Sequence, residues 1–128
     1  IDGDFTIDRK GNYFYIHDYS VNRSNVNQTV DFAWSCEFLE HVDEEYIPNY
    51  MPDFPKAKYV VMTFSEKPGH HHVNLKPAEY WINVFDSYGF THDKEVTSKI
   101  RNASTMNTTG KFTKKQFVKT NGLFFVKR

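Results

Sequence analysis

Side chains that could do chemistry gather in two short segments of the 128-residue chain. The first, residues 31–42, reads Asp-Phe-Ala-Trp-Ser-Cys-Glu-Phe-Leu-Glu-His-Val, so that acids and a histidine follow directly on an apolar run. The second segment consists of three consecutive histidines, His70, His71 and His72. Imidazoles titrate near neutral pH, where they can accept a proton, and they are also common metal ligands. Both segments are therefore candidates for a catalytic site.

The three consecutive histidines allow three interpretations. Neighbouring side chains on an extended segment point to opposite sides, so only one or two of the three could converge on a metal ion. No carboxylate or cysteine that would complete such a site is evident close by, and we expect no metal site. The other interpretations are a solvated loop and a pocket-lining imidazole that accepts a proton. His41 is a further candidate for the base, and its alternative is a structural role.

The single cysteine, Cys36, excludes an internal disulfide and a multi-cysteine zinc site. It is interpreted either as a reactive thiol or as a small apolar residue at the end of a strand. One cysteine favours a reducing, cytoplasmic compartment, and the chain has no apolar run of about 18 residues that could span a membrane. The 16 basic and 16 acidic residues balance, which argues against a nucleic-acid-binding protein.

Strands and helices must position these residues, and four apolar runs have strand character. They are residues 13–16, 30–34, 58–64 and 122–126. The third run is almost continuously apolar, which is typical of a strand in a parallel sheet covered on both faces. We therefore expect residues 59–64 to form a central, buried strand.

Two helices are predicted between these strands. Residues 37–51 carry apolar side chains at spacings of one, three and four, and Pro48 is expected to end or kink this helix. Residues 77–88 have a more regular amphipathic pattern, beginning with Pro77 in the first turn. Gly89 is expected to cap this second helix at its C-terminus.

Beyond the second helix, residues 91–101 are predicted to form another strand, and residues 102–115 a polar loop or an edge hairpin. Strands that alternate with helices indicate an α/β fold. The length and the lack of linker-like boundaries indicate a single domain over residues 1–128.

The segment 31–42 resembles the motif after the fourth strand of class I S-adenosylmethionine-dependent methyltransferases, where an acid opens the strand and Glu-His-Val follows it. Tyr15-Ile16-His17-Asp18 resembles the preceding strand of that family, and Ile1-Asp2-Gly3-Asp4 the end of its second strand. The Gly-His-His-His-Val-Asn sequence of residues 69–74, followed by Tyr80-Trp81, resembles small bacterial and phage members. The resemblance implies a Rossmann-like sheet with helices on both faces.

The resemblance also implies a binding site for S-adenosylmethionine. Asp18 would approach the adenine amino group, and Asp2 would accept hydrogen bonds from the ribose hydroxyls, because a carboxylate can accept from both. Taken alone, Asp2 is better explained as a surface acid in a turn. The other implied cofactor contacts are Ser35, Cys36 and Glu37. The implied reaction is methyl transfer to a small-molecule acceptor, with His41 and His70 to His72 as the base candidates.

None of the six glycines forms the Gly-x-Gly turn that opens this family's fold. We therefore expect the N-terminal strand–loop–helix upstream of Ile1, and cofactor binding only in a longer chain. Without that unit, the strand edges beside it leave backbone groups unpaired, which upstream residues, a rearranged strand order or a second copy in a homo-oligomer would cover. The rival interpretation is a non-catalytic binding or assembly protein that has lost the glycine-rich turn.

Overall fold

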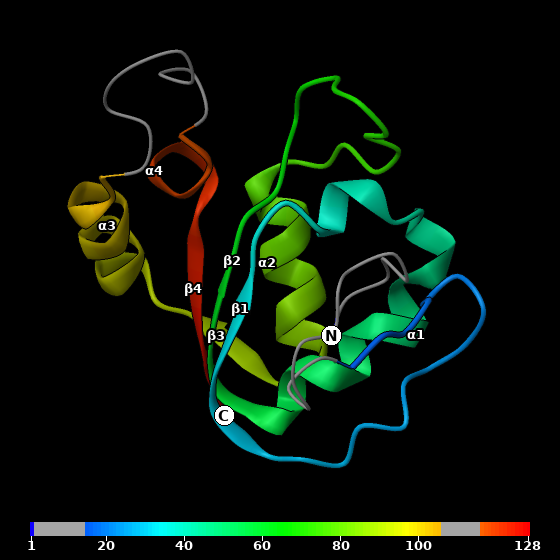
Figure 1. Ribbon diagram of the computed structural model, residues 1–128. Coiled ribbons are helices and arrows are strands. Elements are labelled where there is room, and N and C mark those ends of the chain that lie inside the picture. The colour runs from blue at the N-terminus through cyan, green and yellow to red at the C-terminus, as the bar shows by residue number, and fades with distance from the viewer. Residues whose placement is uncertain (2–14, 106–115) are drawn as a thin grey trace.

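The computed structural model describes residue 1, residues 15–105 and residues 116–128, and Figure 1 shows how their elements are arranged. A four-stranded sheet in the order β1-β2-β4-β3 forms the centre. Its strands are β1 (Val30–Ser35), β2 (Ala57–Met62), β3 (Phe90–His92) and β4 (Leu123–Lys127). Helices lie on both sides of this sheet, so the fold is α/β as expected.

The sheet is mixed, which corrects the expectation of a parallel one. β1 and β2 are parallel, with Ser35 opposite Met62, whereas β4 runs antiparallel to both β2 and β3. β4 runs in the reverse direction because it begins at the end of the sheet where β3 stops. His92, the last residue of β3, lies opposite Phe125 of β4. The carboxyl ends of β1 and β2 therefore share one edge, and β4 starts at that edge.

The helical elements of the described residues are mostly short. They are η1 (Leu39–His41), η2 (Glu44–Tyr46), α1 (Ile47–Tyr50), η3 (Met51–Lys56), α2 (Ala78–Ser87), α3 (Lys94–Ala103) and α4 (Phe117–Asn121). The single helix expected over residues 37–51 is wrong, because Glu37 has a positive φ of 52° and Val42 is extended. Pro48 lies in the first turn of α1, where a missing N–H costs nothing, and does not end it.

α2 confirms the helix predicted over residues 77–88. Trp81 and Phe85 are fully buried, and the Phe85 ring stacks on Phe125 of β4 with centroids 4.3 Å apart. Gly89 has a φ of +88°, which L side chains rarely adopt, and its N–H donates to the Asp86 carbonyl at the helix end.

β2 lies between β1 and β4 and is buried at Val60, Val61 and Met62, which confirms the central strand. The main core lies between this sheet and α2. β1 is an edge strand of the described sheet, and the side chains on one of its faces are about half exposed. These are Val30 (49%), Phe32 (49%) and Trp34 (55%).

The strand predicted over residues 91–101 is limited to β3. Asp93 then caps α3 by accepting from the Val96 N–H at 2.9 Å, so the rest of that segment is helical. Half of the strand predicted over residues 13–16 lies outside the described residues, and Ile16 forms a single bridge. Most of the polar loop predicted over residues 102–115 lies outside them as well, and its first two residues belong to α3. Among the described helices, none has the length and apolar character needed to cross a bilayer.

Candidate functional site

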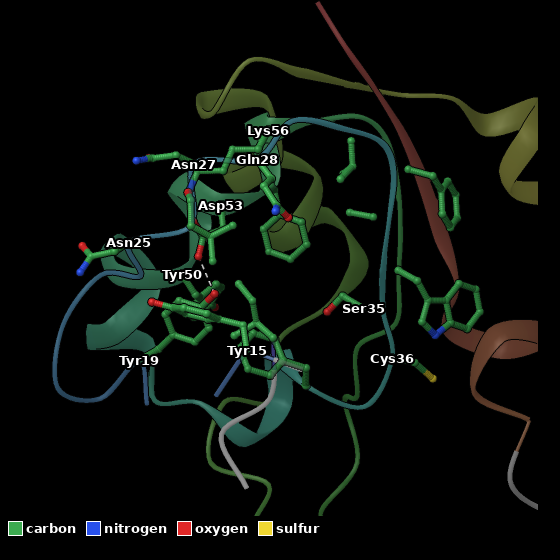
Figure 2. A pocket seen from close by; sticks show the side chains of 18 of the residues that line it. Tyr15, Tyr19, Asn25, Asn27, Gln28, Ser35, Cys36, Tyr50, Asp53 and Lys56 are labelled. Carbon is green, nitrogen blue, oxygen red and sulfur yellow. Dashed lines mark hydrogen bonds and ion pairs between the residues drawn. The ribbon is translucent and has the colours of Figure 1, made fainter. Parts of the chain in front are cut away.

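A hollow of about 900 Å³ runs along β1 from Val30 and reaches Phe38 beyond the carboxyl end of the strand, and Figure 2 shows it from close by. Ser35, Cys36 and Glu37, the predicted cofactor contacts, are among the residues that line it. Its other polar lining comes from the segment before β1 and from η3, and includes Tyr19, Asn25, Asn27, Gln28, Asp53 and Lys56. The hollow therefore combines the length of a strand with a wall of mixed polar and apolar side chains.

Asp18 does not line this hollow, and Asp2 lies outside the described residues. Asp18 lines a smaller hollow of about 250 Å³ that shares Tyr19 and Phe38 with the first. Its carboxylate accepts from the N–H and the hydroxyl of Ser20, at 2.9 and 2.7 Å, and these bonds lower its pKa. Asp18 thus closes a local turn at the border between the two hollows.

Asp53 holds the wall of the larger hollow together. Its side chain is only 15% exposed and accepts from the Ser24 hydroxyl at 2.6 Å, from the Tyr19 hydroxyl at 2.5 Å and from Lys56. Burial alone would raise the pKa of Asp53, but these hydrogen bonds outweigh it and lower the pKa below its usual value. Burial and the bond to Asp53 also raise the pKa of Tyr19, which therefore stays a protonated donor.

Cys36 has the properties of a small, unreactive side chain. Partial burial is the largest cause and raises the pKa of its thiol; the hydrogen bond to Thr63 opposes it, and the negative charges of Glu37 and Glu40 add to the increase. Because the thiolate is the nucleophile, a raised pKa makes Cys36 a poor one. The geometry favours the apolar interpretation of this residue over the reactive one.

A second group of side chains gathers beside the hollow, at the same edge of the sheet. Glu37, Glu40, His41 and His72 each offer one potential ligand atom, and these atoms all lie within 4.8 Å of one another. We call these four residues the Glu–His cluster. Glu37 also lines the large hollow, so the two sites meet at this residue.

The ends of two parallel strands bring the cluster together. The Thr63 N–H donates to the Ser35 carbonyl at 2.9 Å, and the Thr63 hydroxyl accepts from the Glu37 N–H at 2.9 Å. One turn further on, the Glu40 carbonyl accepts from the N–H groups of Val73 and Asn74, at 2.8 and 3.1 Å. The loop after β2 is thereby tied to the turn after β1, which brings His72 next to His41.

Backbone carbonyls hold the two histidine rings of the cluster. Nδ1 of His41 lies 3.0 Å from the His71 carbonyl, and Nδ1 of His72 lies 2.8 Å from the Lys67 carbonyl. A carbonyl can only accept, so each Nδ1 carries a proton and the neutral ring keeps its lone pair on Nε2. The two rings meet edge to face with centroids 4.8 Å apart. His70 and His71 are exposed and lie outside the cluster.

Glu40 is the most unusual member of the cluster. Its side chain is fully buried, and neither carboxylate oxygen has a hydrogen-bond partner among the residues that the structure describes. It is the only charged group among the buried side chains of the described residues that lack a partner. A buried carboxylate without a partner is costly, so a structure that keeps one points to a ligand for it.

The ligands near the three consecutive histidines do not include this cluster when only neighbouring residues of the sequence are considered. The carboxylates come from the turn after the neighbouring strand, about 30 residues earlier in the chain. A signal was present in the spacing, because Glu37, Glu40 and His41 stand at i, i+3 and i+4, which share one side of a helical turn. Recognising it requires knowing that the two strands are parallel neighbours.

Comparisons with protein-family models, with curated proteins and with solved structures found no match for this chain. The site and the motif resemblance therefore carry the functional argument.

Proposed function

We propose that this chain belongs to a class I S-adenosylmethionine-dependent methyltransferase that methylates a small molecule. The observation that carries the proposal is the parallel pairing of β1 and β2, whose carboxyl ends share one edge of the sheet. Under the resemblance they are the fourth and fifth strands, which are parallel neighbours in the Rossmann strand order. The assignment agrees with the motif in residues 31–42.

The cofactor is proposed to bind at the carboxyl end of β1. Ligands of open α/β sheets bind outside the carboxyl ends of the strands, and Ser35, Cys36 and Glu37 line the hollow there. Asp18 is exposed and lines the smaller hollow, which shares Tyr19 and Phe38 with the large one. Under the proposal the adenine amino group donates to the Asp18 carboxylate where the two hollows adjoin.

Methyl transfer forms a bond between the acceptor atom and the methyl carbon while the bond from that carbon to sulfur breaks. The protein then acts mainly by holding donor and acceptor in line, and a base is needed only where the acceptor is protonated. His41 and His72 have a free Nε2 at the same sheet edge, which makes them better base candidates than His70 and His71. The proposed site of action is the cytoplasm, which agrees with a single, unpaired cysteine.

A second function, as a non-catalytic assembly protein, has one observation in its favour. Val30, Phe32 and Trp34 expose an apolar face on an edge strand, where another chain could pair. This alternative predicts that the protein forms complexes without binding the cofactor.

Calorimetric titration with S-adenosylhomocysteine, the reaction product, tests the proposal on the protein as translated from its own initiation codon. We expect binding, and we expect Asp18→Ala to weaken it by about 1–3 kcal/mol, the scale of a hydrogen bond to a charged group. Ser20→Ala is the matched control, because it removes a turn contact of Asp18 and leaves the carboxylate. No binding by the wild-type protein would refute the methyltransferase, and equal effects of both variants would refute the role of Asp18.

A further inference from the structure

We propose that the Glu–His cluster is a binding site for a divalent first-row transition-metal cation such as Zn²⁺ or Co²⁺. One carboxylate oxygen each of Glu37 and Glu40 and one ring nitrogen each of His41 and His72 make up the cluster, and we assign the nitrogens to Nε2 because both Nδ1 atoms face backbone carbonyls. The inference goes beyond methyl transfer, because it rests on these four side chains and needs no bound cofactor. It also assigns both Nε2 atoms to the cation, so that neither histidine would act as the base while the cation is bound.

The buried carboxylate of Glu40 is the first reason. It is fully buried and lacks a hydrogen-bond partner within the described part of the chain, and one of its oxygens lies within 4.8 Å of ligand atoms from three other residues. A cation placed among them would neutralise the charge that burial otherwise penalises. The site lies where the carboxyl ends of two parallel strands meet, a usual location for ligands in α/β sheets.

The histidine tautomers are the second, independent reason. In metal sites the ligating imidazole usually donates its other ring N–H to a backbone carbonyl or a carboxylate, which fixes the ring and its lone pair. His41 and His72 both show this arrangement, with the carbonyls of His71 and Lys67 as acceptors. Two rings from different loops thus each keep one nitrogen free of backbone partners, and one nitrogen of each ring lies within 4.8 Å of a Glu40 oxygen.

The donor set favours transition metals over Mg²⁺ or Ca²⁺. Imidazole nitrogen suits Zn²⁺ and its neighbours, whereas Ca²⁺ takes six to eight oxygens and Mg²⁺ keeps several waters. Metal–ligand bonds of about 2.1 Å hold tetrahedral ligands about 3.4 Å apart. The cluster, with atoms up to 4.8 Å apart, therefore closes by small side-chain movements.

Gly69 positions the His72 ring. A Cβ atom at Gly69 would lie 2.7 Å from both Cε1 and Nε2 of His72, a contact too short to persist. The ring is the far end of a side chain, so it would move while the backbone stayed in place. Gly69→Ala therefore displaces a metal ligand without removing it.

The test is titration of the EDTA-treated protein with Zn²⁺ alone, followed by calorimetry, with Co²⁺ absorption as a report on coordination. We expect one Zn²⁺ per chain and much weaker binding of Ca²⁺. Glu40→Gln and His72→Ala should each weaken Zn²⁺ binding by at least about 100-fold, and Gly69→Ala by about 10–100-fold. His70→Gln is the matched control, because this neighbouring histidine lies outside the cluster, and it should bind Zn²⁺ as the wild type does.

Binding of Zn²⁺ that survives Glu40→Gln, or that His70→Gln weakens as much as His72→Ala does, would overturn the site in favour of adventitious binding by the exposed histidines. Absence of stoichiometric binding by the wild type would overturn it as well. Gly69→Ala keeps the test decisive if a ligand variant fails to fold, since unchanged affinity in that variant would contradict the geometry. None of these outcomes depends on the methyltransferase proposal.

Discussion

The carboxylates of Asp53 and Glu40 are both largely shielded from solvent, but they differ in their hydrogen bonds. Asp53 accepts hydrogen bonds from three side chains and ties the wall of the large hollow to η3. Glu40 is more deeply buried and accepts none. Described side chains supply hydrogen-bond donors to the Asp53 carboxylate, whereas residues 15–105 and 116–128 supply none to the Glu40 carboxylate.

The difference separates a stabilising network from a binding site. A buried network with all its members satisfied makes a segment rigid, and an unsatisfied group marks a place where stability has been given up for function. Removing the charge should therefore lower the free energy of unfolding at Asp53 and raise it at Glu40. The predictions below follow from that contrast, beginning with the largest effect.

Asp53→Asn should lower the free energy of unfolding by about 1.5–3 kcal/mol, because it weakens hydrogen bonds to a charged group. Equilibrium urea unfolding at neutral pH measures this change. Lys56→Met serves as a control that removes one of the three partners, and it should cost less. A variant as stable as the wild type would show that the network does not hold the wall.

The same network predicts a pH dependence. The pKa of Asp53 is lower in the folded protein than its ordinary value of 3.8, so its stabilisation is present above pH 3.8 and is lost as pH falls through the folded pKa. Urea unfolding between pH 5 and pH 2 should show a steeper loss of stability in the wild type than in Asp53→Asn. Parallel pH profiles would contradict this assignment.

Glu40→Met should have the opposite effect on the stability of the metal-free protein from that of Asp53→Asn. Replacing the unpartnered carboxylate by an apolar side chain of similar size should raise the free energy of unfolding by about 1–2 kcal/mol. Unfolding in the presence of EDTA measures this gain, and added Zn²⁺ should stabilise the wild type but not the variant. Destabilisation in EDTA would mean that Glu40 has a structural partner.

Thr63→Val tests the link between the two sites at the ends of the parallel strands. Thr63 is fully buried, and its hydroxyl accepts from the Glu37 N–H, which holds a residue with positive φ next to both sites. We expect a loss of about 1 kcal/mol in stability and several-fold weaker Zn²⁺ binding. Unchanged Zn²⁺ affinity would show that Glu37 is held by other contacts.

The smallest effect concerns Cys36, which lines the hollow and directly precedes Glu37 of the cluster. The charges of Glu37 and Glu40 help to raise its pKa, so a cation bound to them should lower it. Alkylation by iodoacetamide at pH 7 should be slow in the metal-free protein and several-fold faster with Zn²⁺ bound. Equal rates in Glu40→Gln, with and without Zn²⁺, are the expected control result.

The parts of this fold that local patterns predict are those in which the pattern and the packing agree. The continuous apolar run predicts β2, because this strand is buried at successive residues. The regular apolar face predicts α2, because this helix is buried along one side. Residues 37–51 have a helical spacing too, but the positive φ of Glu37 and the extended Val42 break it into short turns.

The Glu–His cluster could not be found from local spacing alone. Its members come from two loops that meet only because β1 and β2 pair in parallel, with Ser35 opposite Met62. Asp18 illustrates the converse, because its place in the sequence motif indicates a cofactor contact while its carboxylate closes a local turn with Ser20. Residue type and order predict which groups are available, and strand pairing determines which of them meet.

The most direct test of the central claim, that Glu40 is buried in order to hold a cation, is anomalous diffraction at the zinc absorption edge. Crystals of the full protein grown with Zn²⁺ should give one strong peak within about 2.2 Å of a Glu40 oxygen and of Nε2 of His41 and His72. A peak only at the exposed His70 or His71, or no peak at the cluster in the presence of Zn²⁺, would contradict the account.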